Sequence, residues 1–169
     1  MKNLQQPGME LDEDILKRVT ERVIELGVKK QMVSLDELPY LIFDVLKNEQ
    51  EEQIVKILNY SLSLIYVLNP MDTVKMEVNG GAYEQSVSGH GQFNAVSKIM
   101  WKIYKSLNKP IPELLNYVIV IPPGGQTNAF VQTIITWRFK NKVFKTLGLD
   151  GVQTVAAIKA TIKMLNNFD

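Results

Sequence analysis

The clearest stretch that could bind a ligand lies around His90, the only histidine among the 169 residues, which stands between Gly89 and Gly91. The stretch follows a predicted strand and opens a predicted helix. Glycines let a backbone approach a ligand closely, and the free N–H groups of a helix start suit a carboxylate or a phosphate. The pattern therefore indicates either an anion-binding helix start or a tight turn that needs glycine for geometry alone.

Catalysis is not indicated by the residue types. The chain has no cysteine, which excludes disulfides, thiolate metal sites and a cysteine nucleophile. His90 could serve as a general base near neutral pH, but its place between two glycines fits a loop residue or a ligand contact better. The acidic run Asp12–Asp14 is typical of a solvated first helical turn. We therefore expect no catalytic residue, no metal and no cofactor in this chain.

The composition is that of a soluble globular protein, with 46% hydrophobic and 22% charged residues. The net charge of +1 gives no general attraction to nucleic acid or to an anionic membrane. No apolar run is long enough to span a bilayer, and the first residues lack the apolar centre of a signal peptide. The expected localisation is cytoplasmic, with neither a membrane nor a nucleic acid as partner.

One stretch, residues 137–145, interleaves aromatic and basic side chains as single-strand binders do. The alternative is a hairpin with a basic polar face. Trp137 and Phe139 share the parity of Ile135 along a predicted strand, which places both rings on the inner face. The hairpin is the favoured interpretation.

Residues 9–47 have the apolar spacing of two helices. The first is expected to end at Gly27, and the second to begin at the capping box Ser34–Glu37. The inward residues of the second are expected to be Leu38, Leu41, Ile42, Val45 and Leu46. This helical hairpin is too small to be an independent domain, so its apolar faces need another surface.

After a charged linker at 48–53, the apolar period changes to two, and strands are expected at 60–66, 74–78 and 83–87. The helix that follows is expected to turn one face inward: Phe93, Val96, Ile99, Met100, Ile103, Tyr104 and Leu107. The second half repeats this order, with strands at 115–121, 131–139 and 143–147. Its helix is expected to present Val152, Val155, Ile158, Ile162 and Leu165, with Ala156, Ala157 and Ala160 allowing close packing.

The two halves look like copies of one unit. Gly148 follows Gly89 by 59 positions, and three apolar helix positions recur at the same offset. The predicted fold is α+β: a helical linker subdomain at 1–50, then a duplicated βββα-βββα domain at 51–169, with units at about 54–109 and 110–169. Each antiparallel sheet can cover one face with its own helix. The other sheet faces would need each other or a second chain.

These residues resemble the C-terminal part of the 2-isopropylmalate synthase and citramalate synthase family. The helical hairpin at 9–47 resembles the family's linker subdomain, with the run at 22–38 similar to its basic-then-acidic stretch before the second helix. Residues 54–169 resemble its leucine-type allosteric, dimerising domain. The first helix start of that domain usually reads Gly-x-Gly-Pro-Val-Asp-Ala, and here it is Gly89–Ala95. In the second half, the matching residues are Gly148, Ala156, Ala157, Ala160, Leu165 and Asn166.

The resemblance implies a regulatory role. Enzymes of the family condense acetyl-CoA with a 2-keto acid on a metal-dependent barrel that precedes this region. The chain would bind a branched-chain amino acid, leucine or isoleucine, near a homodimer interface and inhibit that barrel. The divalent metal and acetyl-CoA would belong to the barrel, so this chain should be inactive alone. As effector contacts the resemblance implies Gly89, His90, Gly91 and Ala95, with Tyr83, Trp101 and Tyr104 as weaker candidates for the side-chain pocket.

The helix start departs from the family pattern, because Gln92, Phe93 and Asn94 replace Pro, Val and Asp. A larger ring could reshape a pocket, and loss of the acid could remove a partner for an effector amino group. Two alternatives therefore stay open. One is a structural dimerisation module without an effector, and the other is a free-standing amino-acid sensor.

Overall fold

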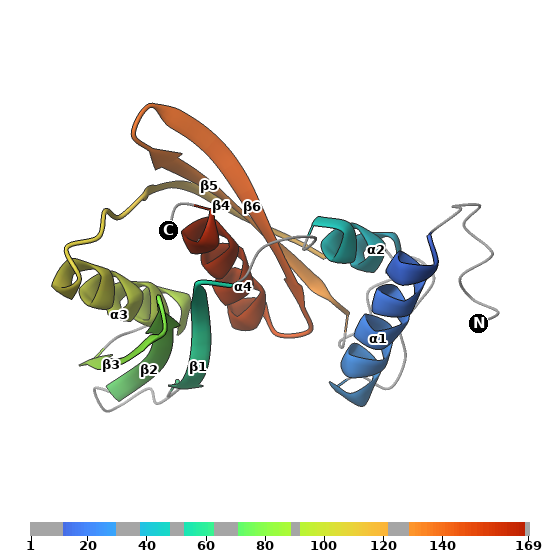
Figure 1. Cartoon of the computed structure of the whole chain (residues 1–169), viewed down its shortest axis with the longest axis horizontal. Helices are drawn as coiled ribbons and strands as arrows, with labels where there is room; N and C mark the ends of the chain where they lie inside the picture. Colours follow the sequence, from blue (N-terminus) through green and yellow to red (C-terminus); the bar gives the residue numbers. More distant parts are fainter. Residues whose placement is uncertain are drawn as a thin grey trace.

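The computed structural model of the chain describes residues 12–29, 38–47, 53–62, 71–88, 92–121 and 129–167. Two helices come first, α1 (Glu13–Lys29) and α2 (Leu38–Lys47). The first unit consists of β1 (Val55–Ser61), β2 (Met71–Val78), β3 (Gly81–Ser88) and α3 (Gln92–Ser106). The second consists of β4 (Glu113–Val120), β5 (Val131–Phe139), β6 (Lys142–Asp150) and α4 (Gln153–Asn166). The predicted α+β fold, a helical hairpin before two βββα units, is confirmed (Figure 1).

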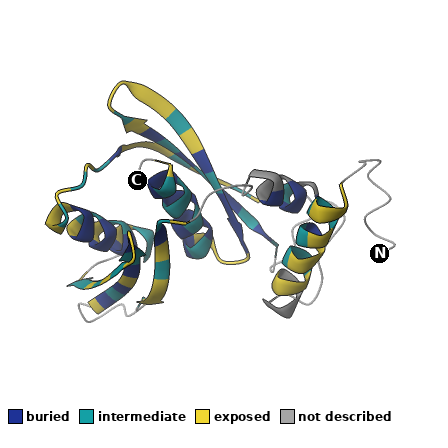
Figure 2. Ribbon diagram, in the orientation of Figure 1, coloured by how far each residue is buried: buried dark blue, intermediate teal, exposed yellow. Residues whose placement is uncertain are grey.

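Each unit contains a three-stranded antiparallel sheet, in the orders β1-β2-β3 and β4-β5-β6. One core joins the two units. It includes Met76 of the first sheet, Ile99 of α3 and Met164 of α4, all fully buried. Trp101 of α3 meets Trp137 of β5 edge to face, with ring centroids 6.2 Å apart. Figure 2 shows α4 largely buried at the centre of the molecule, whereas α1 has an exposed outer side.

The repeat is real, but its offset is 61 rather than 59. The turns β2–β3 and β5–β6 correspond at this spacing, with Asn79 at φ 50° and Lys140 at φ 52°. The buried positions of α3, from Ala95 to Tyr104, recur 61 residues later in α4, from Ala156 to Leu165. In the first strands the offset is 57, because the bulges after Ile57 and Leu114 correspond. The connection to the second strand is therefore four residues longer in the second unit.

The first strand begins earlier than the alternation predicted, at Val55 instead of residue 60. The bulge between Ile57 and Asn59 breaks the period of two. Val55 and Ile57 therefore fall out of step with Tyr60 and could not be recognised as one strand. The predicted part from residue 63 to 66 lies outside the described residues.

Two helix boundaries also differ. Gly27 does not end α1, which continues to Lys29, because a glycine close to a helix end costs only about 1 kcal/mol. Val152 is not an inward residue of α4 but its N-cap, and its side chain is 56% exposed. The second helix begins at Leu38, and its predicted capping box at 34–37 lies outside the described residues.

Gly148 was predicted in a strand-to-helix turn, but it lies inside β6, which extends to Asp150. A Cβ at this position would lie 1.9 Å from the carbonyl oxygen of Ala156 and 2.7 Å from the nitrogen of Ala160. The glycine is therefore needed because the α4 backbone packs directly on the strand. Ala156, Ala157 and Ala160 are fully buried, which confirms the predicted close packing.

The helical hairpin packs on the second unit, as its apolar faces require. Val19 of α1 and Ile42 and Val45 of α2 form its own small core. On the other side of α2, Leu41 contacts Phe130 and Leu149 in a separate buried cluster. Leu149 lies on the face of the second sheet opposite α4, so the hairpin covers one end of that outer face.

Asn166 at the end of α4 joins the two units. Its Oδ1 accepts a hydrogen bond of 2.8 Å from the Val55 N–H, and its Nδ2 donates one of 2.9 Å to the Val55 carbonyl. Nδ2 also donates to the Ile162 carbonyl at 3.0 Å. The amide therefore takes the place of a neighbouring strand at the free edge of β1.

Replacing Asn166 tests this connection. Asn166→Ala should lower the free energy of unfolding by about 1–3 kcal/mol, because it leaves the polar backbone of buried Val55 without partners. Asn166→Asp should cost at least as much, since a carboxylate cannot donate to the Val55 carbonyl. Urea unfolding followed by circular dichroism measures both variants. Wild-type stability in both would show that the amide contributes nothing.

Gly148→Ala should destabilise the fold by about 3 kcal/mol or more, since α4 must move away from β6 to admit the methyl group. Gly151→Ala is the matched control, because a Cβ there meets nothing within 4 Å. Thermal unfolding of the two variants should separate them clearly. Equal melting temperatures would contradict the close approach of α4.

Candidate functional site

The site predicted from the sequence is the start of α3. Gly89, His90 and Gly91 lie outside the described residues, and the described part begins at Gln92. Gln92 and Phe93 are half-buried, and Asn94 is exposed. The Phe93 carbonyl accepts a hydrogen bond of 2.8 Å from the Ser97 hydroxyl.

The starts of the two repeat helices meet. The Thr154 hydroxyl, in the first turn of α4, donates a 2.6 Å hydrogen bond to Oε1 of Gln92, in the first turn of α3. Beside it, the Phe93 ring packs on Tyr117 of β4, with centroids 5.1 Å apart. The substituted residues Gln92 and Phe93 thus contact the second unit. The positive ends of two helices lie together at this point.

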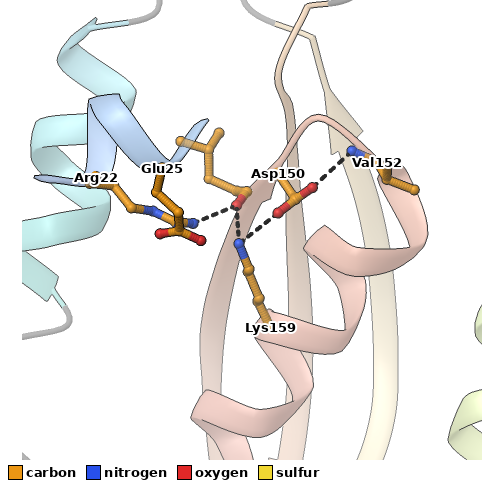
Figure 3. Close-up of polar contacts among 6 residues, drawn as sticks. Arg22, Glu25, Asp150, Val152 and Lys159 are labelled. Carbon is orange, nitrogen blue, oxygen red and sulfur yellow. Dashed lines mark hydrogen bonds and ion pairs between the residues drawn. The ribbon is translucent and has the colours of Figure 1, made fainter. Parts of the chain in front are cut away.

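The start of α4 carries its own carboxylate. Oδ1 of Asp150 accepts a hydrogen bond of 3.1 Å from the Val152 N–H, and Oδ2 pairs with Nζ of Lys159 at 2.7 Å. Lys159 also donates to the Leu149 carbonyl at 3.3 Å. Figure 3 shows this cluster, in which Asp150 is 2% exposed. A buried carboxylate held by an N–H group and an ammonium is charge-compensated.

The two helix starts differ in charge. At the repeat offset of 61, Asp150 corresponds to Gly89, and Gln153 corresponds to Gln92. The second unit therefore places a side-chain carboxylate before its helix, while the first unit has a glycine there. The carboxylate of a bound ligand would therefore meet no side-chain carboxylate of the protein at that position of the first unit.

Arg22 connects the helical hairpin to the same cluster. Its Nη2 lies 3.5 Å from the Leu149 carbonyl, and its Nη1 pairs with Glu25 at 2.5 Å (Figure 3). The carbonyl of Leu149 thus receives donors from α1 and from Lys159 of α4. The helical hairpin and the start of α4 share one acceptor, beside the apolar contact of Leu41 with Leu149.

Of the remaining predicted effector residues, Ala95 lies in the first turn of α3, whereas Trp101, Tyr104 and Tyr83 lie outside it. Ala95 is 1% exposed and faces the core. Trp101 comes nine residues after Gln92, about 13 Å along the helix, and packs edge to face on both Tyr104 and Trp137. Tyr104 is 3% exposed. Half-buried Tyr83 also packs against this core. Their contact with an effector stays a prediction, and what the structure shows for them is core packing.

Other sequence predictions can be placed as well. Trp137 is fully buried, and its indole N–H donates to the Thr146 hydroxyl at 2.8 Å, so it points inward as expected and cannot stack on a base. Across the described ranges, no three histidine, aspartate or glutamate side chains lie together as a metal site would require. None of the described helices is long and apolar enough to cross a membrane.

Sequence reasoning missed the cluster of Arg22, Asp150 and Lys159. A weak signal was present, because Asp150-Gly151 follows a strand and Lys159 comes two and a half helical turns later. Those residues could not be joined to Arg22, which lies 127 positions before Leu149 in the chain. Only the packing of α2 on β6 brings them together.

Comparison with known proteins agrees with this architecture. Residues 32–168 match the family model described as the LeuA allosteric (dimerisation) domain. The chain is similar to a 2-isopropylmalate synthase of Aquifex aeolicus (strain VF5), with 27% identity over 166 residues. The match covers 98% of this chain but only 31% of that enzyme. With its two βββα units inside the matched range, the chain belongs to the LeuA allosteric (dimerisation) domain family.

Proposed function

We propose that the chain is the regulatory and dimerising region of an acetyl-CoA-dependent 2-keto-acid synthase similar to 2-isopropylmalate synthase. In this proposal it binds leucine or isoleucine and transmits feedback inhibition to a catalytic barrel of the same enzyme. The family match and the enzyme relative support the role. The observation that carries the effector site is the pairing of two helix starts through Gln92 and Thr154.

The chemistry of that place suits an amino acid. Free N–H groups at the α3 start would bind the carboxylate, and Gly89 offers no side-chain acid there, unlike Asp150 in the second unit. Phe93, Tyr117 and exposed Ile119 supply apolar surface beside it for a branched side chain. An uncharged apolar pocket next to a few polar donors is the usual form of a small-molecule site.

A structural module without an effector is the second candidate, and the same contacts favour it. The Gln92 amide is hydrogen-bonded to Thr154, and the Phe93 ring packs on Tyr117. These side chains replace Pro and Val of the family pattern, and here they serve the contact between units.

Titration calorimetry with leucine, isoleucine and valine separates the two candidates. We expect leucine or isoleucine to bind in the micromolar to millimolar range, and valine about tenfold more weakly, since it offers one methylene less. Gly91→Val should weaken binding at least tenfold with little change in melting temperature. Gly151→Val, at the other helix start, is the control and should bind normally.

The outcomes are distinct. No heat from any of the three amino acids at millimolar concentration, with a folded protein, would leave the structural module as the function. If Gly91→Val lost stability and binding together, the glycine would be needed for the turn alone.

We further propose that Leu149 and Asp150 carry the effector signal to the helical hairpin. Leucine bound at the paired helix starts would change the position of the α4 start. Arg22 would transmit this displacement to α1, because Arg22 and Lys159 share the Leu149 carbonyl as acceptor. Regulation of this kind is a coupling free energy between two sites.

Hydrogen exchange with and without leucine tests the route. In the wild-type chain, leucine should slow exchange in residues 13–29 as well as at the α4 start. In Arg22→Ala, leucine affinity should stay within about twofold, while the effect on residues 13–29 disappears. Lys17→Ala, an exposed change on the same helix, should behave as wild type. Persistence of the α1 effect in Arg22→Ala would refute the route.

A further inference from the structure

Among the described residues, the largest group of exposed apolar side chains lies on β4 and the residue after it. Leu114, Leu115, Val118 and Ile119 are 37–42% exposed, and Ile121 is 61% exposed. The stretch from 114 to 121 contains no charged residue. The one charge on β4, Glu113, forms a 3.0 Å ion pair with Arg138 of β5. A continuous uncharged apolar strand at a sheet edge indicates an interaction surface.

The packing of the helices explains why β4 is left open. Within its unit, α3 packs on β2 and β3, and α4 packs on β5 and β6. The first strand of each unit must be covered from elsewhere. β1 receives α4 of the second unit, which buries Val55 completely. Over the described residues, the counterpart contact on β4 is the Phe93 ring on Tyr117, and Leu114 and Ile119 stay exposed.

We propose that a second copy of this chain covers β4, through the stretch 114–121. This inference deepens the dimerisation part of the proposed function and depends on it. The stretch lies inside the range that matches the dimerisation family. In a two-fold dimer the same surface meets itself, and an uncharged strip does so without repulsion. A helix of the other unit covers β1. By analogy, we expect a neighbouring chain to cover the exposed side chains of β4.

The face of β4 that carries Leu114 and Ile119 is better suited to this contact than the edge of the strand. Oδ1 of Asn116 accepts a 2.9 Å hydrogen bond from the Tyr117 N–H, so this backbone donor is already occupied. Addition of a strand would compete with that bond, whereas packing of side chains leaves it intact. We therefore infer an interface of apolar side chains.

The first unit supports the assignment by contrast. At the offset of 57, Leu114 and Ile119 of the second unit correspond to Ile57 and Leu62 of the first. Ile57 and Leu62 are partly buried and pack against the core, whereas Leu114 and Ile119 are 42% and 39% exposed. The same face is therefore covered in the first unit and open in the second.

Sedimentation equilibrium of charged variants tests the surface. The wild-type chain should be a dimer, and Ile119→Lys and Ile121→Lys should each raise the dimer dissociation constant at least tenfold. Val143→Lys is the matched control, because Val143 is 60% exposed on the same sheet but lies on β6, at the opposite edge. It should leave the dissociation constant unchanged. Circular dichroism confirms that each variant is folded.

A second measurement needs no variant. Hydrogen exchange of residues 113–121 in the wild-type chain should slow as protein concentration rises through the dissociation constant, while residues 81–88 of β3 should not change. A wild-type monomer would overturn both this inference and the dimer. If the wild-type chain is a dimer but the lysine variants associate normally, the assignment of the interface to β4 is wrong. The same holds if hydrogen exchange in β4 does not change with protein concentration. Neither result depends on leucine binding.

Discussion

The organising constraint of this molecule is that one helix cannot cover a three-stranded sheet. A helix is about 10 Å wide, and three strands with their side chains are wider. Each repeat helix therefore covers two strands of its own sheet and leaves the first strand open. In the first unit, the open strand β1 is covered by α4 of the second unit. The Asn166 amide on the Val55 backbone is the polar part of that contact, and the shared core is its apolar part.

Because α4 packs on both sheets, the two units are unequal, although they are copies of one unit. Gly148 and three alanines bring α4 close to its own sheet, whereas α3 carries the larger Val96 and Ile99 at the positions of Ala157 and Ala160. Close packing places α4 at the centre, in contact with both sheets. The same arrangement leaves β4 with exposed apolar side chains, since neither α3 nor α4 covers them. Duplication of a unit that is incomplete alone thus produces one internal interface and one open surface.

The meeting of the two helix starts follows from the same packing. Because α3 and α4 lie against each other in one core, their first turns come within hydrogen-bond distance at Gln92 and Thr154. One start has a built-in carboxylate at Asp150, and the other has glycine at the corresponding position. The helical hairpin touches the carboxylate side through Arg22 and Leu41. A change at the helix starts therefore has a short physical path to the hairpin.

The sequence by itself determined the fold class, the helical hairpin, most elements and the inward faces of β2, β5 and α3, because apolar periodicity is a local property. It also indicated the family, through the motifs around Gly89 and Gly148. Only the tertiary structure decided the rest. The bulge after Ile57 breaks the alternation, so the start of β1 could not be predicted. The chance spacing of 59 between Gly89 and Gly148, together with connections of unequal length, concealed the true offset of 61. Arg22 and Leu149, like Asn166 and Val55, lie more than 100 positions apart. Their contacts depend on how whole elements pack, which no local pattern records.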